Sequence, residues 1–348
     1  MTAKETLEPR PGLDISTLPG YDESAPLLQI DDLHVEFHTR DGVVHAVRGV
    51  SYVVEPGDTL GVIGESGCGK SVTAQAIMGI VPPPGRVRRG HIRYQGVDLL
   101  ALDDEQRRGV RAESIAMIFQ DALSALNPVF TVGFQIGELF RKRRGMSRHD
   151  AKRRAVELLD LVRIPEAKSR VSDFPHQFSG GMRQRVMIAM ALALDPDVII
   201  ADEPTTALDV TIQAQIMELL ADLQSRRRMG LILITHDMGV VADVSDHIAV
   251  MYAGKVVETA PVHDVYSAPA HPYTRALLQS IPRVDRSGAA LDVIEGLPPN
   301  LLRVPPGCSF QPRCPIARER CRREEPPLYD VAPGRGSACH YWEEVIGS

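Results

Sequence analysis

The chain has 348 residues, of which 44% are hydrophobic and 24% charged, and its formal net charge is -6. These values are typical of a soluble globular protein with one large domain and an appendage, or with two domains. The negative net charge gives no reason to expect a nucleic-acid partner. The longest apolar run, residues 186–194, is far shorter than the ~18 residues that a membrane-spanning helix requires.

The N-terminal part predicts a tail followed by strands. Residues 1–26 are rich in Pro, Gly, Glu and Thr and lack an apolar signal region, which predicts a flexible tail on a cytoplasmic protein. Residues 27–38 alternate apolar and polar side chains as a half-buried strand does, and residues 43–54 continue with β-branched residues. After a turn, residues 59–64 predict a short buried strand that runs into a glycine-rich stretch.

Helices and strands alternate in the rest of the chain. Residues 147–163 predict an amphipathic helix, and residues 197–203 and 231–237 predict short buried strands that each precede a helix. The residues on the apolar face of the first helix are Ala155, Leu158, Leu159 and Val162. This alternation predicts an α/β fold with a largely parallel sheet. Periodicity fades near Tyr266, where Pro, Arg and Cys become frequent, so we place a domain boundary at about 262–270.

The octapeptide GESGCGKS, residues 64–71, fits the phosphate-loop pattern between a predicted strand and a predicted helix. Glycines let backbone N–H groups curl around phosphate oxygens, and the helix N-terminus adds positive potential. Lys70 is expected to reach the β- and γ-phosphates, and Ser71 to bind Mg²⁺. The alternative is a glycine turn that only joins strand and helix.

Cys68 lies inside this loop, beside Lys70 and a helix N-terminus, which both favour the thiolate. One hypothesis is therefore that alkylating agents modify Cys68 and inhibit the enzyme, and that ATP protects it. The other is a passive small residue that replaces the common serine.

Carboxylates and a capped helix predict further parts of a nucleotide site. The strand 197–203 ends in Asp202, suited to the Mg²⁺ shell, and Glu203, suited to polarise the attacking water, although two solvated acids are the alternative. In residues 178–193, Ser179 can cap a helix whose first glycines let an anion approach, although a plain helix start is possible. His236 ends a predicted strand, where a lone histidine is usually structural.

Taken in chain order, these motifs resemble those of the nucleotide-binding subunits of ABC transporters. GESGCGKS resembles the Walker A motif and VIIADE the Walker B motif with its catalytic glutamate, while FSGGMRQR resembles the LSGGQ signature with Phe178 for Leu and Met182 for Gln. Gln120 matches the Q-loop, residues 207–209 the D-loop, and His236 the switch histidine.

The resemblance implies a P-loop ABC nucleotide-binding domain with a RecA-like parallel core, an antiparallel β subdomain and an α-helical subdomain. We expect a tail at 1–26, the ATPase domain at 27–265 with its helical subdomain at about 121–195, and a small irregular metal- or cluster-binding extension at 266–348. The resemblance also implies a dimer in which ATP lies between the Walker A motif of one subunit and the signature helix of the other.

It further implies roles for individual residues. Glu203 acts as the base, His236 contacts the γ-phosphate, and Gln120 senses the nucleotide and the membrane subunit. The implied ATP contacts are Phe37 on the adenine, then Gly64, Glu65, Ser66, Gly67, Cys68, Gly69, Lys70, Ser71, Val72, Gln120, Asp202, Glu203 and His236. The implied Mg²⁺ ligands are Ser71, Gln120 and Asp202, and Asp209 is the implied D-loop residue. The implied contacts to ATP across the dimer come from Ser179, Gly180, Gly181 and Met182.

Three segments resemble one branch of this family, the oligopeptide and dipeptide importers. These are residues 121–133 after the Q-loop, AHPYTRALL at 270–278, and the cysteine-bearing GCSFQPRCP at 307–315. The resemblance implies a peripheral ATPase subunit at the cytoplasmic face of the membrane that powers the import of peptides, or of nickel or another small solute. The implied partners are a sister ATPase (or a second copy of this chain), two permease subunits and a solute-binding protein. A non-transport ABC ATPase is a distant alternative. A chromosome-maintenance ATPase of this family would have a long coiled coil between the phosphate loop and the signature, but no sustained heptads lie between Lys70 and Ser179.

Four of the five cysteines gather near the C-terminus with the spacing C-x5-C-x6-C-x17-C, at Cys308, Cys314, Cys321 and Cys339. In a reducing compartment such a set suggests a metal site rather than disulfides. Structural zinc sites usually contain close cysteine pairs, so the wide spacing favours a [4Fe–4S] cluster over zinc and over unligated thiols. The resemblance to the importer extension implies the same cluster, in a structural role.

Overall fold

The computed structural model describes residues 14–121, 125–206, 208–280 and 294–347. The chain forms two compact units: a first unit of Met1–Leu27 and Arg93–Met229, and a second unit of Leu28–Ile92 and Gly230–Ser348. The predicted α/β class is confirmed, because strands alternate with helices in both units.

The second unit is built on a sheet whose central strand, β3 (Thr59–Ile63), pairs in parallel with β8 and β9. All five residues of β3 are buried, as the apolar run predicts. Beyond β9 the order continues through β10 and β12 to β11, in antiparallel pairs, so that the last strands of the chain extend this sheet. Besides β3, the second unit contributes to this sheet β8 (Gly230–Thr235), β9 (His247–Tyr252), β10 (Lys255–Pro261), β11 (Tyr329–Ala332) and β12 (Arg335–Ser337).

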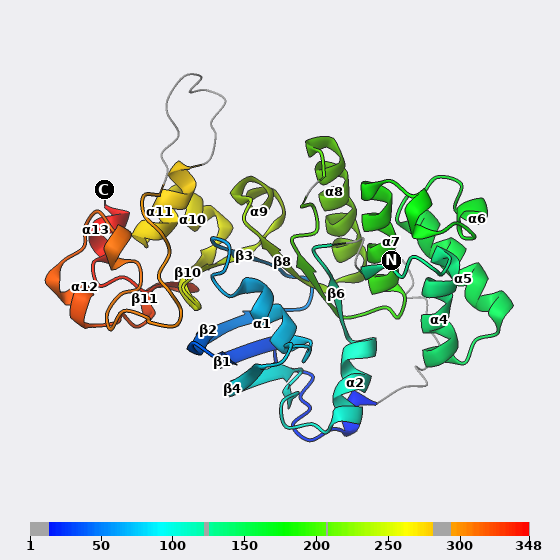
Figure 1. Cartoon of the computed structure of the whole chain (residues 1–348), viewed down its shortest axis with the longest axis horizontal. Helices are drawn as coiled ribbons and strands as arrows, with labels where there is room; N and C mark the ends of the chain where they lie inside the picture. Colours follow the sequence, from blue (N-terminus) through cyan, green and yellow to red (C-terminus); the bar gives the residue numbers. More distant parts are fainter. Residues whose placement is uncertain (1–13, 122–124, 207, 281–293, 348) are drawn as a thin grey trace. The chain divides into compact units, whose positions relative to one another are not determined.

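A second sheet of this unit contains two long antiparallel strands, β1 (Leu28–Thr39) and β2 (Gly42–Val54), with β4 (Gly85–Tyr94) next to β1. These strands are drawn in blue and cyan in Figure 1. They correspond to the strands predicted at 27–38 and 43–54. The helices of the second unit are α1 (Lys70–Ile77), α9 (Met238–Val244), α10 (Val262–Ser267), α11 (Pro272–Gln279), η3 (Gln311–Arg313), α12 (Glu319–Arg323) and α13 (Trp342–Ile346).

The first unit combines a parallel strand pair, β6 and β7, with a group of helices shown in green in Figure 1. The helix predicted at 147–163 is α5 (Arg148–Leu161), which begins at its cap Ser147 and buries the four predicted apolar residues. The other elements of this unit are η1 (Ile15–Thr17), β5 (Val97–Asp98), α2 (Asp104–Glu113), β6 (Ile115–Ile118), α4 (Val132–Arg144), α6 (Ala167–Arg170), η2 (Pro175–Gln177), α7 (Gly180–Leu192), β7 (Val198–Asp202) and α8 (Val210–Arg227).

Part of the predicted N-terminal tail belongs to the first unit. Residues 1–13 lie outside the described residues, but Leu18 is buried and the N–H of Asp22 donates to the carbonyl of Gln95 at 3.0 Å. The predicted domain boundaries after residues 26 and 265 stay predictions. Within the described part of the chain, no helix is both long and apolar enough to cross a bilayer.

Candidate functional site

The predicted phosphate loop connects β3 to α1 in the second unit. Gly64, Gly67 and Gly69 have φ values of 153°, 78° and 106°, which residues with a side chain rarely adopt. A Cβ atom on Gly64 would also lie only 2.2 Å from the carbonyl oxygen of Met251. The loop therefore requires glycine, and it leads directly into the first turn of α1, where Lys70, Ser71 and Val72 lie.

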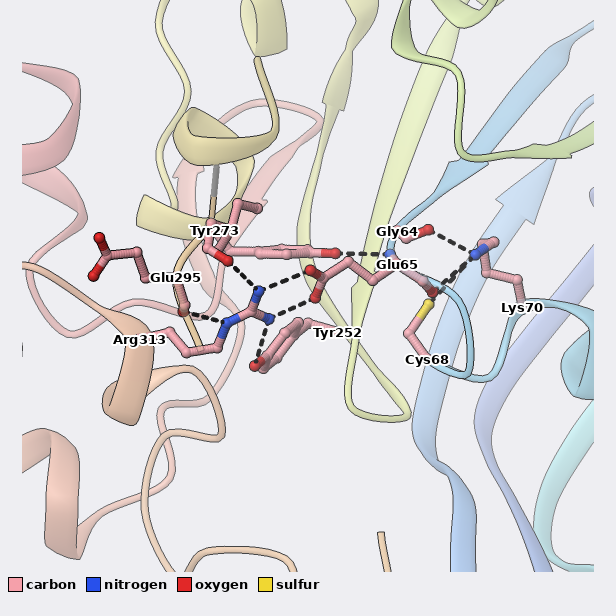
Figure 2. A network of polar contacts seen from close by, with 9 residues as sticks. Gly64, Glu65, Cys68, Lys70, Tyr252, Tyr273, Glu295 and Arg313 are labelled. Atoms are coloured by element: carbon pink, nitrogen blue, oxygen red, sulfur yellow. Dashed lines mark hydrogen bonds and ion pairs between the residues drawn. The ribbon is translucent and has the colours of Figure 1, made fainter. Parts of the chain in front are cut away.

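Lys70 is buried, and its ammonium group is held by the loop itself (Figure 2). The Nζ atom donates to the carbonyl oxygens of Gly64 at 2.7 Å and Glu65 at 3.1 Å, and lies 3.8 Å from the Sγ of Cys68. This places a positive charge against the backbone of the loop, where phosphate oxygens are expected.

Cys68 does not have the environment expected of a reactive thiol. Its side chain is only 4% exposed, and burial raises the pKa of the thiol, although the neighbouring Lys70 acts in the opposite direction. Sequence proximity to Lys70 indicated a thiolate, but desolvation is the larger effect. The structure therefore favours the passive alternative.

Two further predicted ATP contacts belong to the same unit. Phe37 lies on β1 opposite Val44, and its ring packs so closely on Gly85 that a Cβ atom there would be 2.5 Å from Cε1. His236 follows the last residue of β8 and is exposed, while the next residue, Asp237, caps α9 by accepting the N–H of Gly239.

The first unit brings Gln120 and Glu203 together at the ends of adjacent parallel strands. Gln120 follows β6 closely, and its Nε2 donates to Oε2 of Glu203 at 2.8 Å. Thr206 donates its hydroxyl to the same oxygen at 2.8 Å, and Glu203 has a φ of 45°, outside the extended region of the strand before it. Asp202, the last residue of β7, is buried. Two donors thus orient the carboxylate of Glu203.

The predicted signature segment opens α7. The hydroxyl of Ser179 accepts the N–H of Met182 at 3.4 Å, and Gly180 and Gly181 form the first turn. Gly181 is sterically required, because a Cβ atom would lie 2.6 Å from Cγ2 of Ile212. Phe178, which stands where the signature usually has Leu, is buried. Ser179 and Gly180 are exposed, which leaves the start of this helix accessible.

Asp209 has a clear structural partner. Its carboxylate caps α8 by accepting the N–H of Ile212 at 2.9 Å. Of the other D-loop positions, Leu208 belongs to the described residues, whereas Ala207 lies outside them.

The four C-terminal cysteines line one recess of the second unit. Cys308, Cys314, Cys321 and Cys339 share it with His271, Phe310 and other residues, and its volume is about 320 Å³, counting the part open to solvent. Burial raises the pKa of Cys308 to about 11 and that of Cys339 to about 12, and the neighbouring thiols add to the effect.

The predicted metal- or cluster-binding character of the extension is not supported. Among the described residues, no group of three or more His, Cys, Asp and Glu side chains could hold a metal ion. The four thiols nevertheless line one recess.

The segment His271, Pro272 and Tyr273 opens α11. Nδ1 of His271 accepts the N–H of Tyr273 at 3.1 Å, and Pro272 occupies the first turn, where no N–H is needed. Burial lowers the pKa of His271 to about 3, so the ring is neutral and can accept this bond. Glu258 on β10 accepts the N–H groups of Ala270 and His271 at 2.7 and 2.9 Å.

Sequence reasoning missed several residues that contact the predicted site. Thr206 bonds Glu203, while Arg313 and Tyr273 bond Glu65 within the phosphate loop. Threonine next to the Walker B motif gives only a weak signal. For Arg313 the sequence gives none, because it lies 248 positions from Glu65.

The parallel strands, the glycine-rich loop that opens a helix, and the buried lysine define a P-loop nucleotide-binding protein. In such proteins, carboxylates at the end of a strand, here those of Asp202 and Glu203, serve in the hydrolysis of the phosphate bond.

Comparison with known proteins gives the family. The ABC transporter profile matches residues 47–206, and the C-terminal region of oligopeptide/dipeptide transporters matches residues 257–321. The chain is 52% identical over 301 residues to the dipeptide transport ATP-binding protein DppD of Bacillus subtilis, covering 86% of this chain and 90% of the relative. It is 50% identical over 313 residues to the oligopeptide transport ATP-binding protein OppD of Salmonella typhimurium, covering 90% and 93%.

Solved structures agree with this match. A dimeric structure of the bacterial ABC transporter cassette MJ0796 has a TM-score of 0.61 and 27% identity, and covers 68% of this chain and 98% of that chain. The same values hold for a dimeric post-hydrolysis state of MJ0796 bound to ADP and phosphate. The chain therefore belongs to the ABC transporter ATP-binding subunits that carry the oligopeptide/dipeptide transporter C-terminal region. It is an ATPase with the P-loop ABC fold, and the family resemblance seen in the sequence is confirmed.

Proposed function

We propose that this chain is the ATP-hydrolysing motor of an importer for dipeptides or oligopeptides. The proposal rests on the sequence identity of 52% to DppD and 50% to OppD, which extends over most of the chain. The match to the C-terminal region of the same transporters supports it further. Because these relatives are dipeptide and oligopeptide transport proteins, peptides are favoured over nickel or another small solute as cargo. The chain acts as a peripheral subunit at the cytoplasmic face of the membrane.

The phosphate loop and Lys70 hold the triphosphate of ATP, and Phe37 stacks on the adenine. Ser71, Gln120 and Asp202 supply hydroxyl, amide and carboxylate oxygens, which are the donors that Mg²⁺ prefers. When bound, Mg²⁺ neutralises charge that develops on the β- and γ-phosphates.

Glu203 serves as the general base for the attacking water. This role is supported by the hydrogen bonds that Gln120 and Thr206 donate to Oε2 of Glu203, because these two bonds fix the orientation of the carboxylate. His236 contacts the γ-phosphate from the end of β8. Ser179, Gly180, Gly181 and Met182 present the start of α7 to ATP bound by the other ATPase subunit, and Asp209 belongs to the same interface.

The test is Glu203→Gln, which keeps the shape and hydrogen-bonding capacity of the side chain but cannot accept a proton. We expect turnover to fall by about 100-fold or more while ATP binding persists. Glu157→Gln is the matched control, because it makes the same change on the surface of α5, where Glu157 pairs with Arg154. A wild-type rate in Glu203→Gln would exclude Glu203 as the base.

Membrane and ATPase partners complete the motor. Exposed Val129, Phe130 and Phe134 follow Gln120 in the first unit, and the two phenylalanine rings stack at 4.6 Å. Exposed apolar clusters of this kind suit a protein partner, and we assign this one to a permease subunit. The complete assembly contains two permeases, a sister ATPase or a second copy of this chain, and a solute-binding protein. Copurification from membranes tests it, with Phe130→Ser/Phe134→Ser expected to lose the permeases.

We further propose that the four cysteine thiolates hold a [4Fe–4S] cluster in a structural role. The proposal is supported by the four thiols, which line one recess of the second unit.

Anaerobically purified protein is then expected to be brown, with about four irons per chain. Replacing all four cysteines by serine should remove the iron and loosen the extension. Colourless protein that holds one zinc per chain, or no metal at all, would refute the cluster.

A further inference from the structure

The C-terminal extension contacts the phosphate loop through an ion pair between Arg313 and Glu65 (Figure 2). Nη1 lies 2.6 Å from Oε2 and Nη2 lies 2.8 Å from Oε1, so the pair is bidentate. The side chain of Arg313 is only 3% exposed and that of Glu65 27%. A bidentate pair whose arginine is buried fixes position as well as charge.

Arg313 uses all five of its N–H groups. Besides the two bonds to Glu65, Nε donates to the carbonyl of Glu295 at 3.1 Å, Nη2 to that of Ile294 at 3.2 Å, and Nη1 to the hydroxyl of Tyr252 at 3.3 Å. The guanidinium also lies 6.0 Å from the ring centre of Phe310. Because every donor is satisfied, the side chain has one well-defined position.

A second residue of the extension holds the backbone at the same place. The N–H of Glu65 donates to the hydroxyl of Tyr273 at 2.8 Å. Tyr273 is buried against Tyr252 and Phe310, with ring centres 4.6 and 5.3 Å away, and burial raises the pKa of its phenol, which stays neutral. Glu65 is therefore bound through both its backbone and its side chain.

These contacts reach the phosphate-binding lysine. Lys70 donates to the carbonyl of Glu65, so the residue clamped by Arg313 and Tyr273 is also a partner of the ammonium group. Without Arg313, the carboxylate of Glu65 would be an unpaired negative charge within the phosphate loop. It would repel the triphosphate and compete with it for Lys70.

We propose that Arg313 and Tyr273 are positioning residues for the phosphate loop, so that the docked C-terminal extension sets the affinity for ATP. Neither residue touches the reacting atoms; both act through Glu65. Because Arg313 directly precedes Cys314, which lines the cysteine recess, any change that undocks this segment also releases the loop.

The test measures ATP affinity by titration of the full-length chain, alongside ATP hydrolysis. Arg313→Met is expected to weaken ATP binding about tenfold, within the range usual for coupled sites. At saturating ATP the kcat should stay within about twofold of wild type, since a positioning residue for ground-state binding changes KM alone. Arg313→Lys keeps the charge but not the planar guanidinium group. Its affinity for ATP should lie between that of wild type and that of Arg313→Met.

Arg318→Met is the matched control. Arg318 makes a bidentate pair with Glu344 and lies 4.2 Å from the ring centre of Tyr341 in the same extension, but it is 48% exposed. Wild-type ATP affinity is expected in this variant. The wild-type titration itself verifies ATP binding, on which the inference rests.

Two outcomes would overturn the proposal. One is unchanged ATP affinity in a folded Arg313→Met variant. The other is an equal loss from Arg313→Met in wild type and in a Glu65→Gln background, because action through Glu65 requires a smaller loss once the carboxylate is gone. If Arg313→Met does not fold, Tyr273→Phe replaces it, since it deletes only the hydroxyl that holds the N–H of Glu65. Unchanged affinity there would equally refute the proposal.

Discussion

The thiol of Cys68 is expected to resist alkylation at neutral pH. A thiol with the ordinary pKa of 9.0 is about 3% thiolate at pH 7.5, and burial moves Cys68 to a still smaller fraction. Its exposure of 4% also limits access for a reagent. The nearby charge of Lys70 favours the thiolate, but Lys70 is satisfied by the carbonyls of Gly64 and Glu65.

The assay is incubation with iodoacetamide, followed by mass spectrometry of the peptide that contains Cys68, because the four C-terminal thiols would obscure a bulk measurement. We expect little labelling of Cys68 within an hour at pH 7.5 and a rise of about tenfold per pH unit as the pH is raised towards 9. ATPase activity should survive the treatment at pH 7.5. Cys68→Ser should retain ATP binding, since serine is small enough for the same space.

Fast labelling of Cys68 at pH 7.5, with loss of ATPase activity and protection by ATP, would refute this reasoning. It would show that the loop opens often enough for Lys70 to control the thiol. The variant Cys68→Ser separates the two cases, because inhibition that persists in it arises from another cysteine.

Three further predictions concern the loop, a helix cap and the start of α11. Gly64→Ala should weaken ATP binding about tenfold or more, because the new Cβ atom would lie 2.2 Å from the carbonyl oxygen of Met251. Gly145→Ala is the control: Gly145 has a φ of 63° and no atom within 4 Å of a new Cβ atom, so this change should lower stability by about 1 kcal/mol and leave ATP binding unchanged. Asp209→Ala removes the cap of α8 and should lower the free energy of unfolding by about 1 kcal/mol. Asp209→Asn should keep the cap, so slow ATP hydrolysis in this variant would reveal a role of Asp209 beyond capping. Glu258→Ala leaves two buried N–H groups unpaired and should lower the free energy of unfolding in urea by about 2–5 kcal/mol; a change below about 1 kcal/mol would contradict the anchoring role.

The sequence predicts best those parts of the molecule that depend on local pattern. The buried strand before the phosphate loop and the amphipathic helix at 147–163 follow from periodicity, and the helix that starts after Ser179 follows from its capping residue; all three are found. The roles assigned to Glu203 and His236 stay predictions, although the structure places each directly after its strand.

What the sequence did not predict depends on burial and on long-range contacts. Lys70 and Cys68 are neighbours in the chain, which suggested a thiolate, but the desolvation that decides the pKa comes from the packing of other segments. The contact of Arg313 with Glu65 joins positions 248 residues apart, and no local pattern marks it. The cysteine spacing indicated that four thiols might meet, but it could not give the arrangement of their sulfur atoms.

The position of Tyr273 follows from a short chain of buried polar contacts. Glu258 fixes the N–H groups at the start of α11, His271 caps the helix, and its ring is kept neutral by burial. Such contacts contribute little net stability, but breaking any one of them leaves a buried polar group without a partner. Any displacement of the segment that carries Tyr273 therefore costs free energy, because it breaks these contacts. If Arg313 and Tyr273 position the phosphate loop, as we propose, displacement of this segment would change ATP binding without any contact to the nucleotide.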